Sequence, residues 1–418
     1  MRHGLALLLI VLWFGASSVR AADFVGSLYI QSNAADANEV FHYGRRADGT
    51  LVLIGKHPTS GTGSGTFKPL TGQDPGPNAF EGAGSVILSP DRKWLFTTNA
   101  GDNSVSSFRV GSDGHLTLLD HQPTGELVKG RSGTAKSLAF SPKHSTLYVL
   151  HAFGPNHLRV YDLKDGKLSL RPIKRTVDTT TKVGRIPTQL VLSPDQRFLM
   201  TDVLFDAHPA ANPDGSAKLD VTNITDKDGL VVFPIGPDGA PGEPTFQDAG
   251  GAGPFFIQFL HGSNDTFLNG HAVSDGVSVG RIDAQGRVRH DPVVPINASA
   301  GKPSELCWLV LSSDNRTIFA TNFGFSNVSS YRLKDGKLEI AKDPACSPVP
   351  GDGKFRSVNN LVSSGPNDSW LSPDDKTFYQ LYPNASVFVV YRVNADASLT
   401  EIQRTPIPYT SPQGMAGN

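Results

Sequence analysis

The sequence has almost no net charge, which limits the partners that it can attract. Its 38 Lys and Arg residues balance 39 Asp and Glu residues, so the formal net charge is −1 at pH 7, and charged residues make up 18% of the chain. A chain without a basic field has no electrostatic attraction for nucleic acid or for an acidic membrane surface. We therefore expect neither a nucleic-acid partner nor a membrane partner.

Cysteine is also scarce, because the chain contains only Cys307 and Cys346. If the protein is exported, its compartment permits a disulfide between them. The alternative is two free thiols, with Cys307 buried in a strand and Cys346 in a loop. The sequence leaves both alternatives open.

Long apolar runs are rare, and the clearest one lies near the N-terminus. Residues 1–21 begin with a positive charge, continue with an apolar run from Leu5 to Phe14 and end in small residues. The run is too short to span a membrane and is typical of a signal peptide. We expect cleavage after Ala21 and a mature domain, residues 22–418, that is secreted or periplasmic.

Gly and Pro are abundant, with 43 and 30 residues. They separate short segments in which apolar residues recur with a period of two. Residues 83–120 predict four such strands, which are Ser85–Leu88, Trp94–Thr98, Ser104–Val110 and Leu116–Leu119. Ser89-Pro90-Asp91 predicts a tight turn, and Asp113-Gly114 supplies the positive φ of a hairpin. A four-stranded unit cannot bury both faces alone, so it must pack against copies of itself.

Copies of this unit recur through the chain. In each copy an aromatic residue of the third strand precedes a hairpin turn, except that glycine takes its place in the fifth copy. These positions are Tyr43, Phe108, Tyr161, Phe233, Gly280, Tyr331 and Tyr391. Seven units at intervals of roughly 45 to 70 residues predict an all-β, seven-bladed β-propeller with these aromatic rings packed between blades.

The first unit lacks its first strand, because the mature chain opens on the second-strand pattern Ser27–Ile30. Residues 411–418 begin like the first strands of other units. We therefore predict that this C-terminal segment completes blade one and closes the ring, and we expect a monomer. Three oversized loops, residues 59–82, 205–229 and 348–366, fall on one face of such a ring, which is where scaffolds of this kind carry function.

The repeat SPD-x-x-x-LFTTNAGDNSVSSFRV…DGHLTLL, the segment Gly250–Pro254 and the closing SPQG resemble the seven-bladed lactonase family. That family contains 6-phosphogluconolactonases and carboxymuconate-lactonizing enzymes. The resemblance covers essentially the whole mature chain. It implies the propeller fold and a site on the loop-rich face that opens or forms a lactone, and we expect no metal and no cofactor.

The chain departs from the family pattern around the channel. The family's Gly-Pro-Arg-His at the start of blade five reads Gly-Pro-Phe255-Phe256 in this chain. The start of blade four usually brings a histidine into the channel, whereas here it reads Pro187-Thr188-Gln189. The arginine that often follows Asn322 is Phe323. Because apolar walls cannot hold a carboxylate or phosphate without a desolvation cost, we expect a largely uncharged substrate.

Other polar residues on the same face are candidates for the chemistry. Glu305 matches the family's glutamate and is the candidate base, with His271 or His151 as its partner and Arg185 or Lys302 as the cation. The candidate substrate-binding residues are Phe255, Phe256, Gln189, Lys302, Asn322 and Phe323. For each of these residues the alternative is a solvated loop position or a structural hydrogen bond.

Two functions therefore remain open. The first is a lactonase-type hydrolase or cycloisomerase that acts on a small lactone. The second is a non-catalytic propeller that binds a small ligand or a partner protein on the same face, because the channel has lost several polar groups of the family.

Overall fold

The computed structural model describes residues 24–66, 83–127, 135–207, 227–296, 301–357, 359–409 and 411–418. Nearly all regular structure in these ranges is β-strand, with one short 3₁₀ helix, η4, at Pro383–Ala385. No helix in the described part of the chain has the length and apolar character needed to cross a bilayer. The predicted signal peptide lies outside the described residues.

The strands fall into seven sheets, which confirms the predicted seven-bladed propeller. Blade one contains β1 (Gly26–Gln31), β2 (Glu39–Arg45), β3 (Leu51–Pro58) and β30 (Gln413–Gly417). Blade two contains β4 (Val86–Leu88), β5 (Trp94–Asn99), β6 (Ser104–Val110) and β7 (Leu116–Pro123). Blade three contains β8 (Ala135–Ser141), β9 (Thr146–His151), β10 (Leu158–Lys164) and β11 (Lys167–Arg175). Blade four contains β12 (Ile186–Pro187), β13 (Val191–Leu192), β14 (Phe198–Phe205), β15 (Leu230–Pro234) and β16 (Thr245–Gln247).

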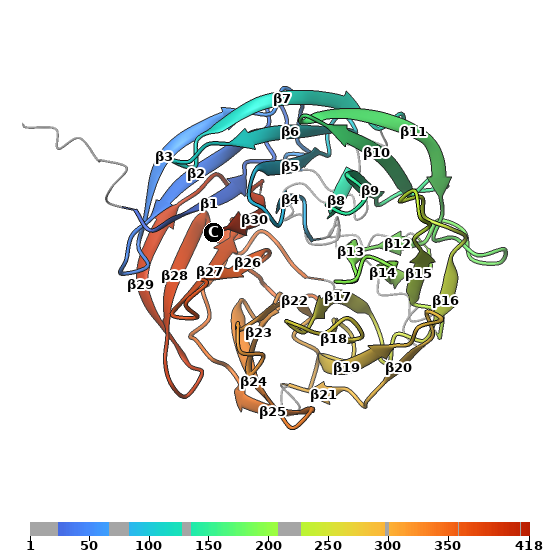
Figure 1. Cartoon of the computed structure of the whole chain (residues 1–418). Helices are drawn as coiled ribbons and strands as arrows, with labels where there is room; N and C mark the ends of the chain where they lie inside the picture. The colour runs from blue at the N-terminus through green and yellow to red at the C-terminus, as the bar shows by residue number, and fades with distance from the viewer. Residues whose placement is uncertain are drawn as a thin grey trace, which may run out of the picture.

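The remaining blades follow the same antiparallel order. Blade five contains β17 (Pro254–Phe259), β18 (Thr266–His271), β19 (Gly276–Ile282), β20 (Val288–His290) and β21 (Val294–Pro295). Blade six contains β22 (Leu306–Leu311), β23 (Thr317–Asn322), β24 (Asn327–Lys334) and β25 (Lys337–Lys342). Blade seven contains β26 (Ser369–Leu371), β27 (Thr377–Tyr382), β28 (Val387–Val393) and β29 (Leu399–Pro406). Figure 1 shows the blades in a ring around a central axis.

The C-terminal strand closes the ring as predicted. β30 pairs with β1, with Ala416 opposite Tyr29, so that blade one is built from both ends of the domain (Figure 1). The backbone N–H of Gly414 donates to a carboxyl oxygen of Asp368 at 2.8 Å, and the Asn367 amide donates to the Pro412 carbonyl at 3.0 Å. The closing segment is therefore tied to blade seven as well as to blade one.

The predicted aromatic positions lie in the packing of the blades. The six aromatic rings of the repeat are all buried, namely Tyr43, Phe108, Tyr161, Phe233, Tyr331 and Tyr391. In blade five, Gly280 leaves room for its neighbours, because a Cβ there would lie 2.4 Å from the Phe267 ring. His290 packs edge-on against Phe267 with ring centroids 5.6 Å apart. These two rings fill the place of the missing aromatic side chain.

A second repeated contact joins neighbouring blades on the hairpin side. A side-chain hydroxyl of one blade donates to the backbone carbonyl at the hairpin turn of the next blade. The hydroxyl belongs either to a tyrosine of the second strand or to a serine of the third strand, and these two positions face each other across the strand pair. From the second strand the bonds are Tyr29 to Gly114 (2.7 Å), Tyr148 to Gly239 (2.8 Å) and Tyr379 to Gly49 (2.9 Å). From the third strand they are Ser107 to Gly166 (2.5 Å) and Ser330 to Ala397 (2.8 Å).

Where the second strand lacks this tyrosine, the bond forms only if the residue opposite it on the third strand has a hydroxyl. Phe96 pairs with Ser107, which supplies the hydroxyl from the opposite strand. Blades four and five have apolar residues at both positions, Met200 opposite Val232 and Leu268 opposite Val279. Those two blades have no equivalent bond among the described residues.

Cys307 and Cys346 are both buried free thiols. Of the two alternatives that the sequence leaves open, the structure therefore shows the unpaired one.

Candidate functional site

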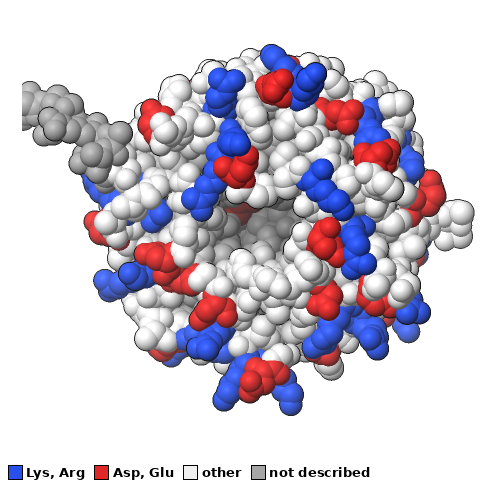
Figure 2. Space-filling model, viewed as in Figure 1, with Lys and Arg blue, Asp and Glu red and all other residues white. Residues whose placement is uncertain are grey.

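The starts of the first strands meet at the centre of the ring, and one of them crosses it. The N–H of Ala83, at the start of blade two, donates to the Thr188 carbonyl of blade four at 3.0 Å, and Ala83 forms a parallel bridge with Gln189. Figure 2 shows one face of the ring, with a hollow at its centre and charged side chains of both signs around it.

An aromatic cluster surrounds Ala83 inside the ring. Its large members come from blades three to six and from the loop between blades six and seven, and they are Phe153, Phe205, Phe255, Phe256, Trp308, Phe323 and Phe355. Phe255 packs edge-on against Trp308 with ring centroids 4.9 Å apart, and Phe323 packs the same way against Phe355 at 5.7 Å. The candidate binding residues Phe255, Phe256 and Phe323 therefore lie together in one apolar cluster.

Glu305 is a buried carboxyl at the edge of this cluster, directly before β22. Its φ of 60° lies in the left-handed region, which costs a non-glycine residue about 1 kcal/mol or more. The Ser357 hydroxyl donates to Oε1 at 2.8 Å, and the backbone N–H of Asn359 donates to the same oxygen at 2.7 Å. The other oxygen, Oε2, is buried and has no hydrogen-bond partner among the described residues.

The environment of Glu305 makes it a proton acceptor near neutral pH. Burial raises the pKa of its carboxyl from 4.5 to about 7, although the hydrogen bonds from Ser357 and Asn359 oppose the rise. A carboxyl with such a pKa and one free oxygen has the properties of a general base. Sequence reasoning found Glu305 but missed Ser357 and Asn359, which lie more than fifty positions away in the chain.

Two further buried carboxyls lie at blade junctions. Burial raises the pKa of Asp202 well above its usual value, although the Asn269 amide donates a hydrogen bond to its carboxyl at 3.3 Å. Burial also raises the pKa of Asp368 to about 6, against the hydrogen bond from Gly414. These groups join neighbouring blades, and sequence reasoning missed Asp368.

The two candidate histidines, His271 and His151, form hydrogen bonds with other residues of the scaffold. His271 Nε2 lies 2.9 Å from the Ser278 hydroxyl, and burial lowers its pKa to about 3. His151 Nε2 lies 2.9 Å from the Thr124 hydroxyl, and burial lowers its pKa to about 4. Both rings are therefore neutral and hydrogen-bonded within the scaffold. The expected partnership of either histidine with Glu305 does not form in this structure.

The two candidate cations, Arg185 and Lys302, also have surroundings that differ from those of Glu305. Arg185 is fully buried and donates to Asp206 at 3.0 Å and to Asp228 at 2.8 Å. Lys182 contacts the same two carboxylates at 3.0 and 2.9 Å. Arg185 thus helps to fasten the two ends of the blade-four insertion. Lys302 is exposed at the start of blade six.

The remaining candidates have structural contacts. The side-chain oxygen of Gln189 accepts a hydrogen bond from the Ile257 N–H at 2.7 Å. Asn322 donates to Asn327 and Ser329, each at 2.7 Å, inside blade six. Sequence reasoning missed Lys136, a buried cation at the start of blade three that donates to the Pro187 carbonyl.

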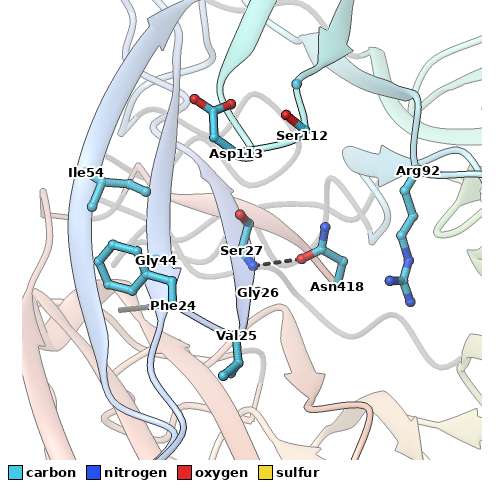
Figure 3. Close-up of a pocket in the computed structure, with 12 residues that line it drawn as sticks. Phe24, Val25, Gly26, Ser27, Gly44, Ile54, Arg92, Ser112, Asp113 and Asn418 are labelled. Atoms are coloured by element: carbon cyan, nitrogen blue, oxygen red, sulfur yellow. Dashed lines mark hydrogen bonds between the residues drawn. The ribbon is translucent and has the colours of Figure 1, made fainter. Parts of the chain in front are cut away.

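No group of three or more His, Cys, Asp or Glu in the described ranges has the arrangement of a metal site. A hollow of about 300 Å³ lies at the junction of blades one and two, on the hairpin side, and Ser27, Arg92, Asp113 and Asn418 are among the residues that line it (Figure 3). None of the candidate residues lines this hollow.

Comparison with known proteins supports the resemblance to lactonases. A family model described as a seven-bladed β-propeller lactonase matches residues 59–132. No curated protein matches the chain. Solved structures do match, and their identities of 14 to 16% show the fold alone.

One such structure is a periplasmic gluconolactonase from Pseudomonas aeruginosa, which is 16% identical, with a TM-score of 0.65 over 94% of this chain and 98% of that one. Another is a candidate 6-phosphogluconolactonase from Bacteroides uniformis, which is 14% identical, with a TM-score of 0.65 over 95% of this chain and 100% of that one. With the matched segment and the seven blades, these findings confirm that the chain resembles the seven-bladed propeller lactonases.

Proposed function

We propose that this protein is an exported lactonase-type hydrolase that opens a small, largely uncharged lactone on the loop-rich face, with Glu305 as the general base. The observation that carries the proposal is the free Oε2 of Glu305, which is held next to an aromatic cluster by two hydrogen bonds to its other oxygen. The family model and the lactonase names of similar structures support the reaction class.

The proposed reaction adds water to the lactone. Glu305 Oε2 takes a proton from a water molecule, whose oxygen attacks the lactone carbonyl carbon. The ring C–O bond then breaks, and the proton passes to the leaving oxygen, so that lactone and water give a hydroxy acid. A positioned base of this kind contributes roughly 10²- to 10⁴-fold to the rate. Because Oε2 is buried, the substrate must displace groups that are packed over it.

The aromatic cluster determines which lactones we expect to react. A carboxylate or phosphate against Phe255, Phe256 and Phe323 would lose its hydration without a cationic partner there. An alkyl portion of the substrate would instead gain from contact with these rings. We therefore expect neutral lactones with an apolar portion to react and 6-phosphogluconolactone to remain intact.

The test is a hydrolysis panel with δ-valerolactone, δ-decalactone and 6-phosphogluconolactone. We expect kcat/KM to increase from the first to the second lactone, and Glu305→Gln to lower it by roughly 100-fold or more. Glu243→Gln is the control, since Glu243 is an exposed carboxylate on the outside of the ring. In the wild type, kcat/KM is expected to rise with pH as Glu305 ionises near pH 7.

Two results would contradict the proposal. Rapid turnover of the phosphorylated lactone would reveal a cation site in the cluster. Turnover that Glu305→Gln leaves intact would remove Glu305 from the reaction. If no lactone reacts and a ligand binds equally to wild type and Glu305→Gln, the protein is instead a non-catalytic binding propeller.

A further inference from the structure

A second hollow lies on the loop-rich face, and none of its lining residues belongs to the aromatic cluster. It has a volume of about 440 Å³ and lies between three segments that are distant in sequence. Asp352 and Lys354 come from the loop between blades six and seven, Asn384 and Ser386 from η4 and its end, and Tyr409 from the segment that leads to the closing strand.

The polar groups of this hollow form one connected set. The Tyr409 hydroxyl donates to Asp352 Oδ2 at 2.5 Å, and the Lys354 N–H donates to Asp352 Oδ1 at 3.0 Å. The Lys354 ammonium lies 3.8 Å from Asp352 Oδ2 and 5.6 Å from the centroid of the Tyr409 ring. One carboxylate and one ammonium thus stand side by side, so the hollow has no charge of one sign to attract an ion.

The side-chain oxygen of Asn384, in the lining of this hollow, is a hydrogen-bond acceptor without a donor among the described residues. The Asn384 side chain is fully buried and lines the hollow, and its amide nitrogen lies 3.5 Å from the Tyr409 hydroxyl oxygen. Its Oδ1 has no hydrogen-bond partner among the described residues. A buried acceptor without a donor costs roughly 1 to 3 kcal/mol, which a ligand hydroxyl could recover.

The chemistry of these groups selects one class of ligand. The ammonium of Lys354 offers donors, whereas Asp352 and Asn384 offer acceptors, and Ser386 has a hydroxyl that can do both. A ligand must therefore present donors and acceptors in close alternation. Hydroxyl groups do so, and the apolar C–H face of a sugar ring can also contact the Tyr409 ring.

We propose that this hollow is a binding site for a small uncharged sugar, separate from the proposed catalytic site and independent of it. The sugar ring contacts Tyr409, and hydroxyls bond Asp352 and Lys354. A further hydroxyl donates to Asn384 Oδ1, which is buried and becomes accessible only when the groups packed over it move. Because such a hollow is open and the ligand is small, its affinity lies in the millimolar range.

The test is ligand-observed saturation-transfer NMR on the wild-type protein with D-glucose, D-galactose and D-mannose. Potassium D-gluconate is the charged comparison, and cyclohexanol is the comparison with a ring and one hydroxyl. We expect at least one neutral sugar to bind with a millimolar Kd, and both comparison compounds to bind at least about tenfold more weakly.

Substitutions of residues that line the hollow test whether the sugar binds there. We expect Tyr409→Ala and Lys354→Ala each to weaken sugar binding by about tenfold. The matched control is Lys376→Ala, because Lys376 lies 3.8 Å from Asp374 and is exposed on the hairpin side, with the same spacing as Lys354 and Asp352. Thermal unfolding of each variant checks that the ring remains folded.

The proposal is overturned if none of the three sugars binds at concentrations up to about 100 mM. It is also overturned if Tyr409→Ala, folded as the wild type, binds the sugar equally well. Equal losses in Lys354→Ala and Lys376→Ala would show that the sugar contacts the general surface and not this hollow.

Discussion

The hairpin side and the loop-rich side of this ring hold their blades together in different ways. On the hairpin side, one type of hydroxyl-to-carbonyl bond recurs at five blade seams, supplied by Tyr29, Tyr148, Tyr379, Ser107 or Ser330. On the loop-rich side the buried groups Glu305, Asp368 and Arg185 each have different partners. The repeated hydroxyl-to-carbonyl bonds hold the blades together. The contacts that do not repeat position the polar side chains of the candidate site.

The largest effect that we expect comes from removing the closing strand. Deletion of residues 411–418 takes the backbone partner away from β1 and leaves Asp368 without the N–H of Gly414. Because the total stability of a domain is about 5 to 15 kcal/mol, a loss of several kcal/mol should lower the melting temperature strongly. Equal melting temperatures for the full-length and the truncated mature protein would contradict closure by β30.

The next effect concerns the repeated aromatic rings. Phe108 is fully buried, so Phe108→Ala should lower the free energy of unfolding by about 3 to 5 kcal/mol. Urea unfolding measures this loss, with Leu53→Ala as the control, since Leu53 is 44% exposed on the outermost strand of blade one. A loss below about 1 kcal/mol for Phe108→Ala would show that the ring is not part of the packing between blades.

Most of the fold could be predicted from the sequence because the repeat encodes it. A period of two, turn residues and an aromatic position recur in nearly every blade, and each recurrence confirms the others. The inter-blade hydroxyls are the exception, since Tyr148 and Ser107 occupy different strands and become equivalent only through cross-strand pairing. The sequence shows which residues repeat, but not which neighbour each one contacts.

The candidate site was less predictable, because its contacts join residues without a common period. Glu305 was found through its place in the family pattern, whereas Ser357 and Asn359 reach it from a loop. His271, His151 and Arg185 were named from their positions in the chain, yet their side chains bond to Ser278, Thr124 and Asp206. Side-chain direction in a loop is determined by tertiary contacts that one sequence does not reveal.

Glu305 should make the stability of the loop-rich side depend on pH. Burial raises its pKa from 4.5 to about 7, so the stability gained from the protonated carboxyl is complete below pH 4.5 and is lost as the pH rises through about 7. Over this range we expect wild-type stability to fall relative to Glu305→Gln by up to about 3 kcal/mol. Urea unfolding at pH 4.5 and pH 8 measures the difference, and parallel values for both proteins would contradict it.

The smallest effect tests the hydroxyl rule of the hairpin side directly. Ser107→Ala removes the bond to the Gly166 carbonyl, which should lower the free energy of unfolding by about 1 kcal/mol. Phe96 pairs with Ser107 and occupies the strand position of Tyr148, whose hydroxyl reaches the Gly239 carbonyl of the following blade. Adding Phe96→Tyr to Ser107→Ala should therefore restore most of the lost stability, because the new hydroxyl meets the unpaired carbonyl from the opposite strand. In the wild-type background the same Phe96→Tyr change should give no gain, since Ser107 already bonds that carbonyl. If Phe96→Tyr changes stability equally in both backgrounds, the two positions are not alternatives and the rule fails.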